Sequence, residues 1–65
     1  MNIAKIIISE PDYTKDEDGI VRPFSKCRII LADGAMYEVN VISFTATQER
    51  VAELWLKEPQ HFRKT

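Results

Sequence analysis

The 65-residue sequence predicts an α+β fold in which a three-stranded antiparallel meander is followed by one C-terminal helix, in the order βββα, with the helix packed on one sheet face. Runs rich in β-branched residues occupy much of the first two thirds of the chain. An Asp-Gly pair separates two of these runs, and after Phe44 the spacing of apolar residues changes from strand-like to helix-like. At this length we expect one small domain, residues 1–65.

The first expected element is a strand over residues 3–9, because this run is β-branched and contains no helix start signal. Pro11 ends the strand or marks its edge. The polar residues 12–19 are expected to form a loop that ends in a tight Asp-Gly turn at Gly19. We expect residues 20–21 to begin an early extension of the second strand, which Pro23 makes an edge or a kink.

The second and third strands, residues 25–31 and 36–43, flank Ala32-Asp33-Gly34, and Asp-Gly between such runs is typical of a β-hairpin. A two-residue turn at Asp33-Gly34 would place apolar residues opposite polar ones along both faces. A three-residue loop, with Gly34 in the left-handed position of a G1 bulge, makes every opposite pair compatible. Because a one-residue slip exchanges the faces of a strand, this agreement favours the three-residue loop.

The three-residue loop assigns each hairpin residue to a face. The predicted pairs are Ile29 with Tyr37, Cys27 with Val39 and Ser25 with Val41 on one face, and Ile30 with Met36, Arg28 with Glu38, Lys26 with Asn40 and Phe24 with Ile42 on the other. Arg28 and Glu38 then form an oppositely charged cross-strand pair.

The helix is expected over residues 46–57, with Thr45 as its N-cap and Gln48 completing a capping box; Thr47 is the alternative cap. Glu58 precedes Pro59, which ends or kinks the helix. The last residues are expected to bring Phe62 back onto the core.

The apolar residues of the helix cover a wide arc centred on Trp55. They are Val51, Ala52, Leu54, Trp55 and Leu56. Such an arc exceeds what one sheet face needs and predicts a second contact. The helix is expected to cover the sheet face formed by Ile6, Ile8, Cys27, Ile29, Leu31, Tyr37, Val39 and Val41.

The opposite face, here called the outer face, remains unusually apolar for a surface in contact with water. It is expected to carry Ile3, Ile7, Phe24, Ile30, Met36 and Ile42 around Lys5, Lys26, Arg28, Glu38 and Asn40. Contiguous exposed apolar patches commonly mark contact sites, which favours a homodimer or a tightly held partner. Two alternatives are that residues 11–22 fold across this face and that the two faces are assigned the wrong way round.

The sequence contains no motif that identifies a substrate, a cofactor or a reaction. Residues 14–25 can be aligned with a calcium-binding loop so that Gly19 takes the position of its invariant glycine. In this alignment Thr14 and Ser25 occupy the first and last positions, which need Asp and Glu. The single histidine and single cysteine cannot form a zinc site of normal composition, and both glycines lie in Asp-Gly turns rather than in a phosphate-binding loop. We therefore expect no catalytic residue, no metal, no cofactor and no small-molecule substrate.

A reducing, cytoplasmic location is expected from the lone cysteine and from the absence of a signal peptide or an apolar run long enough to span a membrane. Cys27 is expected to be a buried apolar residue of the inner face rather than a reactive thiol.

The predicted function is that of a small non-enzymatic protein-interaction module, of the kind that includes inhibitors, adaptors and regulators, some of them of phage or mobile-element origin. It would bind a larger protein or a second copy of itself through the outer face, a strand edge or the helix flank. The candidate partner-binding residues are Phe24, Lys26, Arg28, Ile30, Met36, Glu38 and Ile42. The alternative is a nucleic-acid-binding regulator that uses the basic surface around Lys26 and Arg28, although the net charge of −1 disfavours it.

Overall fold

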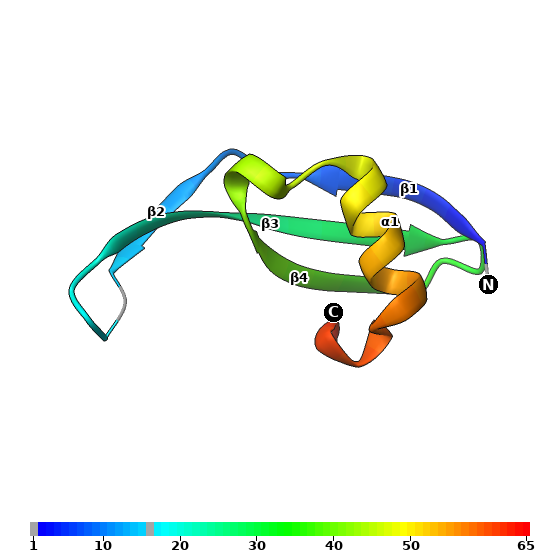
Figure 1. Cartoon of the computed structure of the whole chain (residues 1–65). Helices are drawn as coiled ribbons and strands as arrows, with labels where there is room; N and C mark the ends of the chain where they lie inside the picture. The colour runs from blue at the N-terminus through cyan, green and yellow to red at the C-terminus, as the bar shows by residue number, and fades with distance from the viewer. Residues whose placement is uncertain (1, 16) are drawn as a thin grey trace.

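The computed structural model describes residues 2–15 and 17–65, and it shows an α+β fold with an antiparallel sheet and one helix near the C-terminus, as predicted (Figure 1). The elements in chain order are β1 (Ile3–Ile8), β2 (Asp12–Lys15), β3 (Val21–Leu31), β4 (Met36–Ile42), the 3-10 turn η1 (Ser43–Thr45), α1 (Gln48–Lys57), the 3-10 turn η2 (Pro59–His61) and β5 (Arg63–Lys64). Within the described residues the sheet has five strands, so the prediction of a three-stranded meander is wrong in detail. The strand order is β1-β3-β4-β5, and β2 also pairs with β3.

The β3–β4 hairpin has the predicted register at all seven pairs, from Phe24 opposite Ile42 to Ile30 opposite Met36. The backbone N–H of Gly34 donates to the carbonyl oxygen of Leu31 at 2.9 Å, and the N–H of Leu31 donates to that of Ala35 at 2.8 Å. Gly34 has a φ of 92°, which is the left-handed conformation that the bulge requires. The three-residue loop is therefore confirmed.

The left-handed backbone at Gly34 predicts that Gly34→Ala lowers the free energy of unfolding by about 1–2 kcal/mol, the usual cost of placing a Cβ in this conformation. No atom outside the loop lies within 4 Å of the added Cβ, so the loss is a backbone effect alone. Urea unfolding monitored by circular dichroism would measure it. Gly34→Asn is the matched control, because asparagine tolerates the left-handed region and should cost less; equal losses for both variants would contradict this explanation.

A β-bulge near the start of β1 changes the predicted faces of that strand. The register shifts between Ile3, which pairs with Leu31, and Lys5, which pairs with Ile30. Ile3 therefore packs against the hydrophobic core, and Ala4 is exposed. The prediction that Ile3 lies on the outer face is wrong, because the extra residue of the bulge moves the side chain that precedes it to the opposite face of the sheet.

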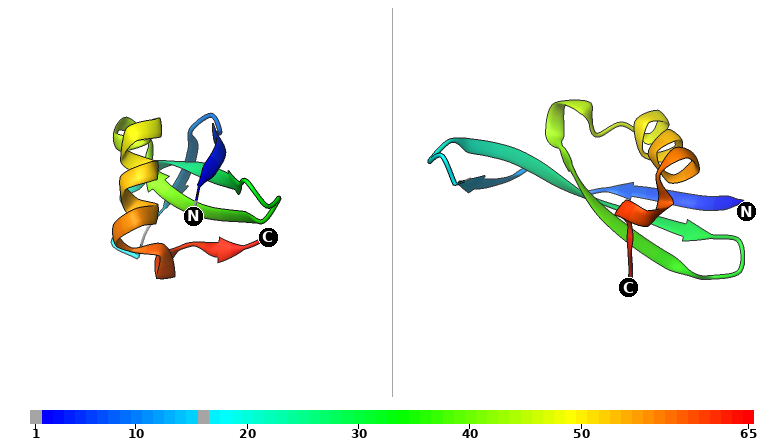
Figure 2. Two further views of the ribbon diagram at one scale, coloured as in Figure 1. Left: turned by 90° about the vertical axis from the view of Figure 1, so that its right-hand side faces the viewer. Right: turned by 60° about the horizontal axis from the view of Figure 1, so that its bottom comes forward.

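Residues 12–19 are not simply a loop, because four of them form β2, which pairs with the first part of β3. Tyr13 lies opposite Pro23, and Gly19, with a φ of 80°, lies in the turn that joins the two strands. This segment extends the sheet as a two-stranded ribbon (Figures 1 and 2). The alternative in which residues 11–22 fold across the outer face is therefore wrong.

The helix α1 begins at Gln48, two residues later than predicted. The side chain of Thr47, the alternative cap, accepts a hydrogen bond from the backbone N–H of Arg50 at 3.1 Å. Thr45 belongs to η1, where its hydroxyl donates to the carbonyl oxygen of Ile42 at 2.9 Å. The predicted cap at Thr45 is wrong because this residue closes the preceding turn.

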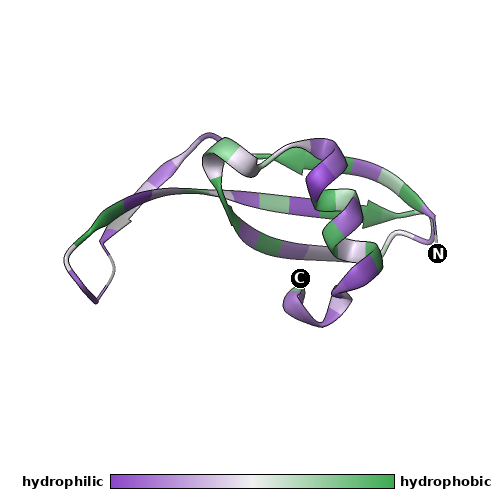
Figure 3. Cartoon of the chain, in the orientation of Figure 1, coloured by the Kyte–Doolittle hydropathy of each residue, from purple (hydrophilic) through white to green (hydrophobic). Residues whose placement is uncertain are grey.

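The core lies between α1 and the sheet. Its buried residues are Cys27, Ile29, Leu31, Val51, Trp55 and Phe62. The ring of Trp55 lies 4.8 Å from that of Tyr37 and 5.2 Å from that of Phe62, the latter edge to face. Phe62 therefore packs back as predicted, whereas Leu56 is 73% exposed and the core-facing arc of α1 is narrower than expected. Figure 3 shows hydrophobic and hydrophilic residues alternating along the central strands.

Cys27 is fully buried in this core, and burial raises the pKa of its thiol above the ordinary value of 9.0. The unfolded thiol ionises near that ordinary value while the folded one stays protonated. The contribution of this residue to stability is therefore complete below about pH 9 and decreases at higher pH, by at most about 1.4 kcal/mol per pH unit.

We expect the free energy of unfolding to fall more steeply above pH 9 for the wild-type chain than for Cys27→Ala, which has no thiol to ionise. Urea unfolding of both proteins at pH 7 and pH 10 would measure the difference. Parallel decreases would contradict the burial of the thiol.

Candidate interaction surface

The seven predicted partner-binding residues all lie on the outer face of the sheet. Phe24, Lys26, Arg28 and Ile30 alternate along β3 with residues whose side chains are buried beneath α1, and Met36, Glu38 and Ile42 lie opposite them on β4. The views in Figure 2 show α1 on one side of the sheet, and in the described part of the chain no helix covers the other. The structure thus brings these seven residues together on one open surface.

An ion cluster centred on Glu38 occupies the middle of this face. Its Oε2 lies 3.6 Å from Nε of Arg28, and its Oε1 lies 3.6 Å from a guanidinium nitrogen of Arg63. The Glu38 side chain is 17% exposed, compared with 73% for Arg63. The carboxylate is therefore held between two cations, although pairs this accessible contribute only about 0–1 kcal/mol to stability.

Arg63 reaches this cluster because β5 pairs with β4 and places Arg63 opposite Glu38. The sequence analysis predicts the pair of Arg28 with Glu38 but misses Arg63. A strand of two residues leaves almost no periodic signal, and the only indication is that Phe62 packs inward immediately before it.

The apolar residues of the outer face flank this cluster. Phe24, Ile30, Met36 and Ile42 are each partly buried, and Ile7 from β1 is exposed beside Arg28. Apolar side chains gathered on one exposed face commonly mark a contact site, and charges among them favour a partner of complementary charge.

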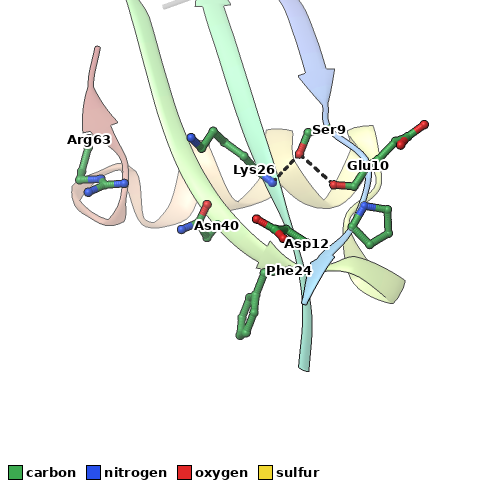
Figure 4. Close-up of a pocket in the computed structure, with 8 residues that line it drawn as sticks. Ser9, Glu10, Asp12, Phe24, Lys26, Asn40 and Arg63 are labelled. Atoms are coloured by element: carbon green, nitrogen blue, oxygen red, sulfur yellow. Dashed lines mark hydrogen bonds between the residues drawn. The ribbon is translucent and has the colours of Figure 1, made fainter. Parts of the chain in front are cut away.

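Two neighbouring depressions shape one end of the outer face. The larger has a volume of about 630 Å3, and its lining includes Glu10, Asp12, Phe24, Lys26, Asn40 and Arg63. Figure 4 shows these side chains extending from Arg63 on β5 to Glu10 beyond the end of β1. The smaller, of about 200 Å3, is lined by Ile7, Ser9, Lys26 and Arg28.

Ser9 joins the two depressions and fixes the corner between β1 and β2. Its hydroxyl accepts a hydrogen bond from the backbone N–H of Lys26 at 2.8 Å and lies 3.3 Å from the carbonyl oxygen of Glu10, to which it donates (Figure 4). Glu10 and Asp12 thereby lie beside the basic residues of β3. Sequence reasoning misses both acids, because it ends the first strand at Ser9 and places Asp12 in a loop.

The single cysteine and the single histidine lie in different parts of the structure. Cys27 is buried beneath α1, whereas His61 is exposed in η2, where its Nε2 lies 3.8 Å from a carboxylate oxygen of Glu58. Among residues 2–15 and 17–65, no group of three or more His, Cys, Asp or Glu side chains is arranged to hold a metal ion. Over the same residues, no helix is both long enough and apolar enough to cross a membrane.

Comparisons of the chain with protein-family models, with curated proteins and with solved structures find no match.

Proposed function

We propose that this chain is a small non-enzymatic protein-interaction module that binds another polypeptide chain through the outer face. The observation that carries the proposal is the open face itself, where half-buried Ile30 and Met36 lie beside the ion cluster of Glu38. Apolar residues gathered on one exposed face favour association with another protein. A binding role also suits the size of the chain, because a domain this small has little room for an enclosed pocket as well as a core.

Within this role the chain would act as an inhibitor, adaptor or regulator in the cytoplasm. Such a protein exerts its effect by occupying a surface of its target, which requires a rigid face rather than catalytic groups. The sheet supplies that rigidity, since β3 is hydrogen-bonded to three other strands and its inner side chains are buried beneath α1.

The proposal is tested by affinity capture with Met36→Lys as the altered bait and Leu56→Lys as the matched control. Met36 is at the outer face, whereas Leu56 is an exposed residue of α1. We expect the wild-type chain and Leu56→Lys to retain the same partner chain. Met36→Lys should lose this partner although it remains folded, as a cooperative unfolding transition would show. Equal retention by all three baits would refute the proposal.

A second candidate function, binding of single-stranded nucleic acid, is favoured by one observation. Phe24, Lys26 and Arg63 line the same depression, which combines an aromatic ring for base stacking with cations for phosphates. Glu10 and Asp12 line it too and would repel phosphate, so this candidate ranks second.

If nucleic acid is the ligand, a single-stranded oligonucleotide should bind the chain with an affinity that falls steeply with salt, and Lys26→Ala combined with Arg28→Ala should abolish binding. Fluorescence anisotropy of a labelled oligonucleotide would measure both effects. Binding that is insensitive to salt would exclude this candidate.

A further inference from the structure

The β2–β3 ribbon, formed by β2, residues 21–24 of β3 and the turn that joins them, is a second surface that the body of the fold leaves uncovered. It projects beyond α1 in Figures 1 and 2, and the molecule measures 40 Å along its longest axis against 19 Å along the other two. A two-stranded hairpin on its own is at best marginally stable in water. An ordered ribbon at the end of the sheet would therefore gain stability from a contact outside its own body.

The side of the ribbon that continues the helix-bearing face of the sheet carries three apolar residues and Lys15. Tyr13 lies opposite Pro23, and Val21 lies opposite Lys15, in positions that alternate with those of the outer face. Tyr13 is 69% exposed and Val21 is 59% exposed. These side chains extend the apolar surface of the sheet beyond the reach of α1.

The ribbon and the outer face carry opposite charges. By sequence, residues 12–24, which make up the ribbon with its turn, contain four acids and two bases; this gives −2 for the ribbon and, because the whole chain has −1, leaves +1 for the rest. The bases of the outer face are Lys5, Lys26, Arg28 and Arg63; the acids are Glu38 between them and Glu10 and Asp12 at the end nearest the ribbon, so the face keeps a small excess of positive charge. One chain thus offers both an acidic arm and a basic surface on which such an arm fits.

We propose that the ribbon of one copy lies against the outer face of a second copy of this chain. This inference rests on the proposed function, because it requires that the outer face bind protein. A two-fold axis repeats the contact, so that each copy contributes one ribbon and one face and the assembly closes as a dimer. A standard interface buries about 800 Å2 on each partner, which is roughly one sixth of the 4782 Å2 surface of this chain.

The test is a charge exchange between two double variants. The ribbon variant carries Glu17→Lys and Asp18→Lys, and the face variant carries Lys26→Glu and Arg28→Glu; all four wild-type residues are exposed. We expect the wild-type chain to form a dimer that weakens with salt, and each variant alone to be monomeric by sedimentation equilibrium. An equimolar mixture of the two variants should form a heterodimer. In one contact the basic ribbon of the ribbon variant meets the acidic face of the face variant, and in the other contact both surfaces keep their native charges.

Glu49→Lys combined with Glu53→Lys is the matched control, since it makes the same change of charge on α1 and should leave the dimer intact. Hydrogen exchange of the backbone amides of residues 12–15, 21, 22 and 24 gives an independent readout and should slow as the wild-type concentration rises. A wild-type chain that stays monomeric, a ribbon variant that still forms a dimer, or a mixture without heterodimer would each overturn the inference.

Failure of this inference is distinguishable from failure of the proposed function. If the wild-type protein is monomeric but captures a partner that Met36→Lys does not capture, only the inference that the partner is a second copy of this chain is overturned. A dimer and a captured partner that both survive Met36→Lys would overturn the outer face as the binding surface.

Discussion

Replacing Trp55 with alanine is expected to leave the chain largely unfolded at 25 °C. Trp55 is buried between Tyr37 and Phe62, with ring centroids 4.8 and 5.2 Å away. Truncating such a side chain typically costs about 3–5 kcal/mol, and a chain of 65 residues has a total stability of roughly 3–10 kcal/mol. The loss is therefore comparable to the whole free energy of unfolding.

Far-UV circular dichroism across a urea titration would measure this effect without relying on the fluorescence of the residue that is removed. Leu56→Ala, at the neighbouring position, is the control. Because Leu56 is mostly exposed and alanine favours helices, the free energy of unfolding of the Leu56→Ala protein should differ from that of the wild type by no more than about 0.5 kcal/mol. Similar losses for both variants would show that Trp55 does not organise the core.

The second large effect is expected at Ile30, on the outer face beside the turn between β3 and β4. Ile30→Glu should weaken association with the partner chain at least about 30-fold, which corresponds to the roughly 2 kcal/mol lost at an interface hot spot. The substitution places a carboxylate between Met36 on β4 and Lys5 on β1, where a covering chain would remove it from water. In the free protein the same side chain remains accessible to solvent, so the fold should survive.

Isothermal titration or sedimentation, combined with thermal unfolding, separates these two consequences. Leu56→Glu introduces the same charge on α1 and should leave the dissociation constant unchanged. If Ile30→Glu bound its partner as tightly as Leu56→Glu does, Ile30 could not lie within the interface.

The β3–β4 hairpin was predictable from sequence because seven cross-strand pairs constrain one register. A loop one residue shorter would have placed apolar residues opposite polar ones along both faces. The matching of the cross-strand pairs therefore excludes the two-residue turn. The position of the seven candidate residues on one face follows from the same constraint. This part of the candidate surface needed no tertiary information.

The remaining elements depend on contacts between segments distant in sequence. In β2, Tyr13 and Thr14 favour strands but are flanked by Asp12 and Lys15, which do not, and the segment is a strand because β3 extends far enough to pair with it. The bulge that moves Ile3 inward and the short strand that brings Arg63 to Glu38 are also set by their neighbours. The acids near Ser9 and the third member of the ion cluster were therefore missed.

The most direct test of the outer face as a binding surface is hydroxyl-radical footprinting of the associated and the dissociated protein. Met36 lies at the outer face and is the most easily oxidised residue there, while Leu56 reports on the helix side. We expect oxidation of Met36 to slow by at least about tenfold on association, as for a side chain that becomes buried, and oxidation of Leu56 to stay constant. Unchanged oxidation of Met36 in the associated protein would contradict a role for this face in binding.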